Sequence, residues 1–177
     1  GCGAAARGIP ITSFEARDLD LSTRMTANGG AEALALIDTE TLVIGLETRG
    51  SDPAPIASTK VTETGIPSFA ATLNAPEATS LTGLDVIDGD RAYAVFRSYD
   101  PMRGNRIAIS KAELNEEGEV TDQDQLLLFG KPYTVDNYEA IAARALNETT
   151  DRVVMISDDN FSDRQRSLLA VFDVVRD

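Results

Sequence analysis

The sequence predicts an all-β fold made of antiparallel, four-stranded blades of a β-propeller, with about three blades present. The first observation is a hairpin pattern in residues 32–47 (EALALIDTETLVIGLE), where two short apolar runs flank a turn. The second is that residues 82–97 (TGLDVIDGDRAYAVFR) match it without a gap, and that a third copy begins at Glu139. Self-similarity at a period near fifty residues is typical of propeller blades and related arrays.

Further strands complete each unit. The hairpin turns are expected at residues 38–41 and 88–90. Two candidate strands follow each of the first two hairpins, which makes four per blade; they cover residues 56–62, 68–73, 106–114 and 125–129. The third hairpin is followed by one strand, 168–174, and residues 10–21 are the candidate for its missing outer strand.

Two local segments need separate predictions. Residues 138–146 are rich in alanine, which also suits a helix, but the repeat favours a strand. Residues 98–105 (SYDPMRGN) predict a long hairpin loop at the end of a blade.

The chain is expected to be a single domain, 1–177, with an N-terminal segment 1–28 and a repeat region 30–177. Three blades do not close a ring of the usual four to eight. We therefore expect the C-terminal half of a larger propeller. The alternative is a partial architecture whose open sheet edges favour self-association.

Composition limits the partners. The chain has 177 residues, 42% of them hydrophobic, which suits one globular domain with a core. Its net charge of -13 disfavours nucleic acid and anionic membrane surfaces and favours cations and small molecules. No apolar run approaches the roughly 20 residues of a membrane-spanning helix, so no transmembrane segment is expected.

Two absences narrow the chemistry. The sequence has no histidine, which excludes a Ser-His-Asp esterase. Cys2 is the only cysteine, so neither an intramolecular disulfide nor a thiolate zinc site can form. Cys2 lies in GCGAAARG, which suggests either lipid attachment after export or a truncation boundary. We expect an exported protein, periplasmic or extracellular.

Acidic and amide residues crowd the stretch 133–173, at positions where the chain should turn: Asp136, Asn137, Glu139, Asp158, Asp159 and Asn160. The composite VDNYEAIA … VVMISDDNFSDRQRSLLAVFDV resembles the C-terminal signature of the phytase-like family of β-propeller proteins with esterase-like activity. Ala140 stands where that family usually has glycine, and Ser167 where it usually has threonine. The alanine would matter if its backbone required a positive φ.

The resemblance implies an exported bacterial hydrolase that acts, with help from a divalent cation, on a small molecule containing a phosphate or ester group. It does not by itself establish phytase activity, because the chain lacks the basic surface expected for gripping phytate. The alternative is a non-catalytic binding or scaffolding propeller with structural calcium.

The repeat predicts where a cation would lie. Glu32, Thr82 and Glu139 are equivalent in the repeat and should meet at one mouth of the channel. Carboxylates and amides without histidine or cysteine suit calcium or magnesium, with calcium favoured. The candidate ligands are Glu32, Asp136, Glu139, Asp158, Asp159 and Asn160. The alternatives are Asx turns at 158–160, and salt bridges from Glu32 and Glu139 to Arg97 or Arg166.

For catalysis, the candidates are Glu139, Asp158 and Arg166. In cation-assisted hydrolysis, Glu139 or Asp158 would orient the attacking water and Arg166 would balance charge. Arg164 and Arg166 are candidate anion binders. Arg166 could instead pair with Asp158 or Asp159 and fix the loop.

Overall fold

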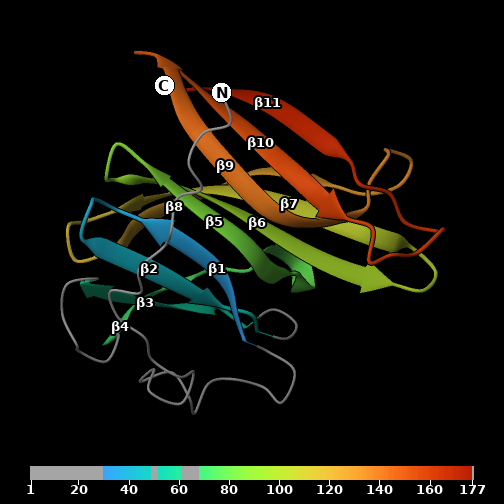
Figure 1. Ribbon diagram of the computed structural model, residues 1–177, viewed down its shortest axis with the longest axis horizontal. Coiled ribbons are helices and arrows are strands. Elements are labelled where there is room, and N and C mark those ends of the chain that lie inside the picture. The colour runs from blue at the N-terminus through green and yellow to red at the C-terminus, as the bar shows by residue number, and fades with distance from the viewer. Residues whose placement is uncertain (1–29, 49–51, 61–67, 177) are drawn as a thin grey trace, which may run out of the picture.

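The computed structural model describes residues 30–48, 52–60 and 68–176, which form an all-β fold of three antiparallel sheets (Figure 1). Each sheet is a meander in which neighbouring strands follow one another along the chain. The predicted fold class is confirmed: the sheets have the form of consecutive propeller blades. The described residues do not close a ring.

The strands agree with the predicted blades. The first sheet contains β1 (Ala31–Leu36), β2 (Thr41–Leu46), β3 (Ala54–Lys60) and β4 (Ser68–Leu73). After the 3-10 turn η3 (Pro76–Ala78), the second sheet contains β5 (Ser80–Ile87), β6 (Arg91–Asp100), β7 (Gly104–Leu114) and β8 (Val120–Phe129). The third contains β9 (Asn137–Asn147), β10 (Thr150–Asp158) and β11 (Leu169–Val175). The candidate strand at residues 10–21 lies outside the described residues, as does Cys2.

The alanine-rich segment forms strand β9, not a helix. It pairs with β10 along its whole length, and its small side chains let β5 approach closely. A Cβ built on Gly83 of β5 would lie 3.3 Å from the backbone nitrogen of Ile141 and 3.4 Å from the Cα of Ala140. Ala140 does not have a positive φ. Alanine at this position therefore causes no backbone strain.

The prediction of a long loop at residues 98–105 is wrong. Strand β6 continues to Asp100 and β7 begins at Gly104, so three residues make the turn. The carboxylate of Asp100 accepts hydrogen bonds from the backbone nitrogens of Met102 and Arg103, both at 2.8 Å. Gly104 has a φ of 79°, which glycine adopts without strain.

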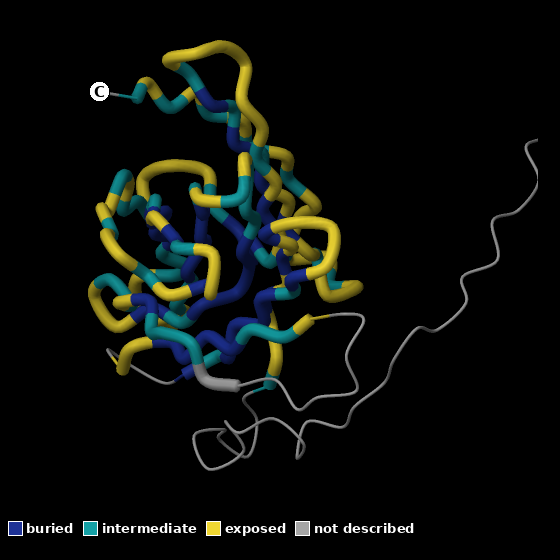
Figure 2. Tube along the Cα trace, turned by 90° about the vertical axis from the view of Figure 1, so that its left-hand side faces the viewer, coloured by how far each residue is buried: buried dark blue, intermediate teal, exposed yellow. Residues whose placement is uncertain are grey.

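The hydrophobic core lies between the blades. Strand β6 is buried on both faces: Phe96 belongs to the cluster shared with the first sheet, whereas Tyr93 and Val95 pack with Met155 of the third. This explains the nearly continuous apolar run AYAVF. Each large side chain buried in this way stabilises the fold by roughly 1.5–3 kcal/mol. Figure 2 shows the buried residues gathered inside and the exposed ones on the turns.

Among the inner strands, β5 lies between β1 and β9 (Figure 1). Equivalent ends of the three inner hairpins therefore face the same end of the molecule. In the described part of the chain, no helix is long and apolar enough to cross a bilayer.

Candidate functional site

Each inner hairpin contains a β-bulge at the same place in the repeat. The strand register shifts by one residue at Glu32 in the first sheet, at Thr82 in the second and at Glu139 in the third. A bulge leaves one residue out of the ladder and redirects its side chain, and bulges are common next to active sites. The equivalence seen in the sequence is therefore a shared backbone feature.

The three bulge residues have different surroundings. Thr82 is buried and donates a hydrogen bond to the carbonyl oxygen of Tyr138 at 3.0 Å, which links the second and third blades. Glu139 lies 3.6 Å from a guanidinium nitrogen of Arg97. Glu32 is exposed on β1.

An open cavity of about 840 Å³ lies at the strand ends of the second and third blades. It is bordered by the β6–β7 turn, the β8–β9 loop, the start of β9 and the β10–β11 loop. Its charged lining residues are Arg97, Lys131, Arg164, Arg166, Asp136 and Glu139. Four cations against two carboxylates make this cavity locally basic in a chain with a net charge of -13. Such a surface attracts anions.

Asp136 fixes the β10–β11 loop against the start of β9. It is 5% exposed, and its carboxylate accepts hydrogen bonds from the backbone nitrogens of Asn137, at 3.0 Å, and Arg166, at 2.9 Å. The guanidinium of Arg166 is 3.9 Å away and mostly exposed. The backbone of Arg166 is thus anchored while its side chain remains accessible.

Glu139 is held from two sides. The side-chain amide of Asn137 donates to one of its oxygens, and Arg97 forms the ion pair with it. The salt bridge considered from the sequence as an alternative is present. The Nε of Arg97 is buried and lacks a hydrogen-bond partner among the described residues.

The Asp158, Asp159 and Asn160 triplet forms Asx turns. Asp158 accepts from the backbone nitrogen of Asn160 at 3.0 Å, and Asp159 accepts from that of Phe161 at 2.9 Å. The hydroxyl of Ser167 also donates to Asp159, at 3.1 Å. Asn160 lines the cavity, whereas the two aspartates do not. Arg166 pairs with Asp136 and not with either of them.

The structure brings some of the predicted site residues together. Asp136, Glu139, Asn160 and Arg166 line one cavity; Glu32, Asp158 and Asp159 do not. Within the described ranges, no three Asp, Glu, His or Cys side chains are placed to share a metal ion. The metal-binding and catalytic roles remain predictions.

The cavity lining also contains residues that sequence reasoning did not name as site residues, among them Lys131, Tyr99 and Tyr133. A signal was present in the turn sequence Gly-Lys-Pro-Tyr at 130–133, where a basic and an aromatic residue stand in a connection between strands.

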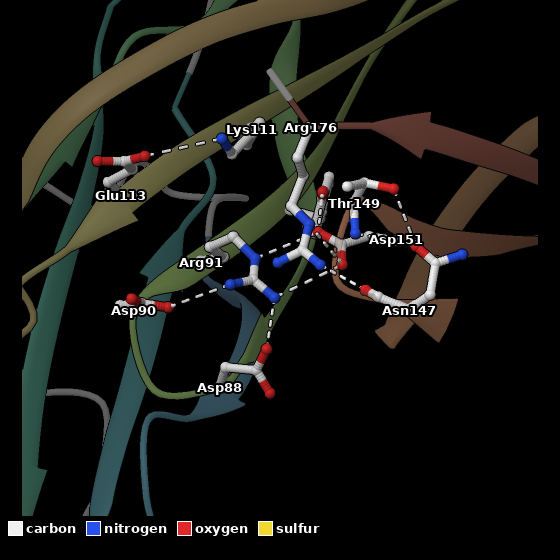
Figure 3. Close-up of polar contacts among 10 residues, drawn as sticks. Asp88, Asp90, Arg91, Lys111, Glu113, Asn147, Thr149, Asp151 and Arg176 are labelled. Atoms are coloured by element: carbon white, nitrogen blue, oxygen red, sulfur yellow. Dashed lines mark hydrogen bonds and ion pairs between the residues drawn. The ribbon is translucent and has the colours of Figure 1, made fainter. Parts of the chain in front are cut away.

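A second polar cluster, also missed, joins the second and third blades near the far end of β9 (Figure 3). Asp151 is completely buried; its carboxylate accepts from the hydroxyl of Tyr93 at 2.8 Å and from the Nε of Arg91 at 3.2 Å. Arg176 lies 3.6 Å away. Burial, and then the neighbouring Asp151 carboxylate, raises the pKa of Tyr93 well above its usual value. Asp151, Tyr93 and Arg91 satisfy one another's hydrogen bonds, which indicates a structural role, whereas the buried Nε of Arg176 has only the ion pair with Asp151 among the described residues.

Antiparallel four-stranded and three-stranded sheets with a polar cavity at their strand ends define a protein built from propeller-type blades. The family model described as "Phytase-like: Esterase-like activity of phytase" matches residues 3–161. The chain therefore belongs to the phytase-like family, which confirms the resemblance carried by the C-terminal motif. A search of curated proteins gave no match.

Proposed function

We propose that this phytase-like protein hydrolyses a small anionic ester bound in the cavity between the second and third blades. The observation that carries the proposal is the excess of cations in the cavity lining, because the rest of the chain is strongly acidic. The proposed substrate contains a phosphate or carboxylic ester.

The side chains have separate proposed roles. Lys131 and Arg164 form no ion pair with an acidic side chain in the described part of the chain, so they are available to an anionic ligand. Arg166 adds charge at the rim, where its backbone is fixed by Asp136. Glu139 would accept a proton from the attacking water, and Arg97 would hold its carboxylate in position. Asp158 shapes the loop beneath Asn160.

A divalent cation, calcium by preference, belongs to the proposal as an expectation from sequence. The carboxylates that line the cavity are already engaged: Asp136 by backbone amides, and Glu139 by Arg97 and Asn137. This arrangement does not form a ready cation cage, and we assign no step of the reaction to the ion. Export to the periplasm or the cell exterior is likewise part of the proposal.

The engaged carboxylates favour a second candidate function. With both cavity acids paired, the same cavity could bind an anionic ligand without turning it over. This is the non-catalytic binding module considered from the sequence.

Turnover measurements separate the two functions. The chain would be assayed with a panel of phosphate and carboxylic esters, with calcium and with a chelator, alongside Glu139→Gln and Leu34→Ala. Hydrolysis is expected in the wild type, lost in Glu139→Gln and retained in Leu34→Ala, which changes an exposed residue of the first sheet. Binding of an ester without turnover of any of them would contradict the hydrolase and support the non-catalytic binding function. A calcium-dependent rise in melting temperature that Glu139→Gln reduces would support the cation.

A further inference from the structure

Two of the three strongly exposed aromatic residues that the structure describes line the cavity. Tyr99 is 66% exposed and Tyr133 is 69% exposed, and both line it. Phe161 is fully exposed and lies between Asn160 and Ser162, which also line it. Elsewhere in the chain aromatic side chains are buried or partly buried wherever the structure describes them. An aromatic ring exposed to water does not contribute the stabilisation that burial would give. Exposed rings that lie at one place on the surface therefore indicate a binding site.

The loop that carries Phe161 contains two Asx turns. Phe161 and Asn160 have φ values of 53° and 49°, an unfavourable backbone conformation for a bulky side chain. The Asx turns of Asp158 and Asp159 hold this conformation. The ring is thus kept at the surface by the loop's own hydrogen bonds.

The available positive charge in the cavity is small. Two of its four cations already face carboxylates, Arg97 with Glu139 and Arg166 with Asp136. Lys131 and Arg164 remain, and together they match an anion of one or two charges. A polyanion such as phytate carries more negative charge than Lys131 and Arg164 could neutralise.

We propose that the ligand of this cavity is an amphiphilic anion, with one phosphate-like or carboxylate group held by Lys131 and Arg164 and an aromatic ring that packs on Tyr133 and Tyr99. The inference rests on the proposed function for the location of the site, and it names the class of substrate: aryl esters with a single anionic group. Offset or edge-to-face ring packing provides the selectivity.

Binding of non-hydrolysable probes tests this independently of turnover. Phenylphosphonate and methylphosphonate carry the same anionic group and differ in the ring. Titration calorimetry or protein NMR on the full chain is expected to show phenylphosphonate binding about tenfold more tightly, which corresponds to about 1.4 kcal/mol. Phytate is expected to bind no more tightly than phenylphosphonate.

Single substitutions test which residues cause the preference for phenylphosphonate over methylphosphonate. Tyr133→Leu should reduce the phenyl preference to about threefold or less without changing methylphosphonate affinity, whereas Tyr133→Phe should retain it. Lys131→Ala should weaken both phosphonates by the same factor, and Leu34→Ala should change neither. Equal affinity for the two phosphonates, or much tighter binding of phytate, would overturn the inference even if the protein hydrolyses esters. A phenyl preference without turnover would support it and contradict the proposed hydrolase.

Discussion

Asp151 and Asp173 both pair with an arginine, but they lie in different environments. Asp151 is completely buried between two blades with Arg91, Arg176 and Tyr93. Asp173 forms a pair of hydrogen bonds with Arg152 on an exposed face, at 2.8 and 2.9 Å. Water competes with Arg152 for Asp173 but does not reach Asp151. The two ion pairs are therefore expected to contribute differently to the stability of the fold.

Replacing Asp151 with alanine should destabilise the protein by about 3–5 kcal/mol, because two arginines and a tyrosine hydroxyl would lose their buried partner. Asp173→Ala is the matched control and should cost about 0–1 kcal/mol. Urea unfolding measures both free energies. Similar losses in the two variants would show that the Asp151 cluster does not hold the blades together.

Asp38 provides a pH-dependent test in the first hairpin turn. Its pKa is lowered because its carboxylate accepts hydrogen bonds from the backbone nitrogens of Glu40 and Thr41, at 2.6 and 2.7 Å, and from the Thr41 hydroxyl. A lowered pKa means that the stabilisation is present above the unfolded value, near 3.8, and is lost as the pH falls through the folded one.

Asp38→Asn should therefore be less stable than the wild type at pH 6, and the difference should shrink below pH 3.8. Thermal melts across this range measure the difference. A gap that widened on acidification would contradict the assigned role of the ionised carboxylate.

The roles that depend on neighbours in the sequence could be predicted from the sequence. The roles that depend on contacts between distant segments could not. The Asx turns at Asp158 and Asp159 follow from their own neighbours in sequence, so the sequence offered them as an alternative. The contact between Asp151 and Tyr93 joins residues 58 positions apart, and only the packing of the blades brings them together.

At the level of the strands, the fifty-residue repeat predicted the inner hairpins because alternation and turn residues are local signals. The ends of strands were less predictable. The segment around Pro101 contains turn-forming residues throughout, yet the ladder continues through the Tyr99 and Asn105 pair. Cross-strand pairing, which a single sequence does not display, decided where the loop began.

Gly83 tests the close approach of β5 to β9. An added Cβ would lie 3.0 Å from a methyl group of Val95 and 3.3 Å from the backbone of β9, so the buried Val95 side chain or the β9 backbone would have to shift. Gly83→Ala should destabilise by about 1–3 kcal/mol. Gly30→Ala is the control, since its nearest atom would be 3.7 Å away, on the Glu32 side chain. Chemical denaturation of both variants measures the effect, and a neutral Gly83→Ala would mean that the strands can separate at little cost.

In the molecule as a whole, the open edges differ in how well they resist pairing with another chain. Both β8 and β11 are edge strands of their sheets in the described structure (Figure 1). Strand β8 exposes Asp122 and Asp124. Strand β11 exposes Leu169 at 68%, Val171 at 51% and Val175 at 73%, and Asp173, its single charged residue, is neutralised by Arg152.

Self-association through an open edge, proposed from the sequence, is therefore expected at β11. Charged residues are the usual protection of an edge strand, and a second copy of β11 in antiparallel alignment would pair the backbone groups that the described residues leave unpaired and cover the exposed valines and leucine. Light scattering of the 177-residue chain should show a molecular mass that rises with concentration. Val171→Lys should suppress this rise because two lysines would face apolar partners across the pair, whereas Thr121→Lys on β8 should leave it unchanged. A mass that stayed monomeric at every concentration, or equal effects of the two lysines, would exclude β11 as the edge through which copies associate.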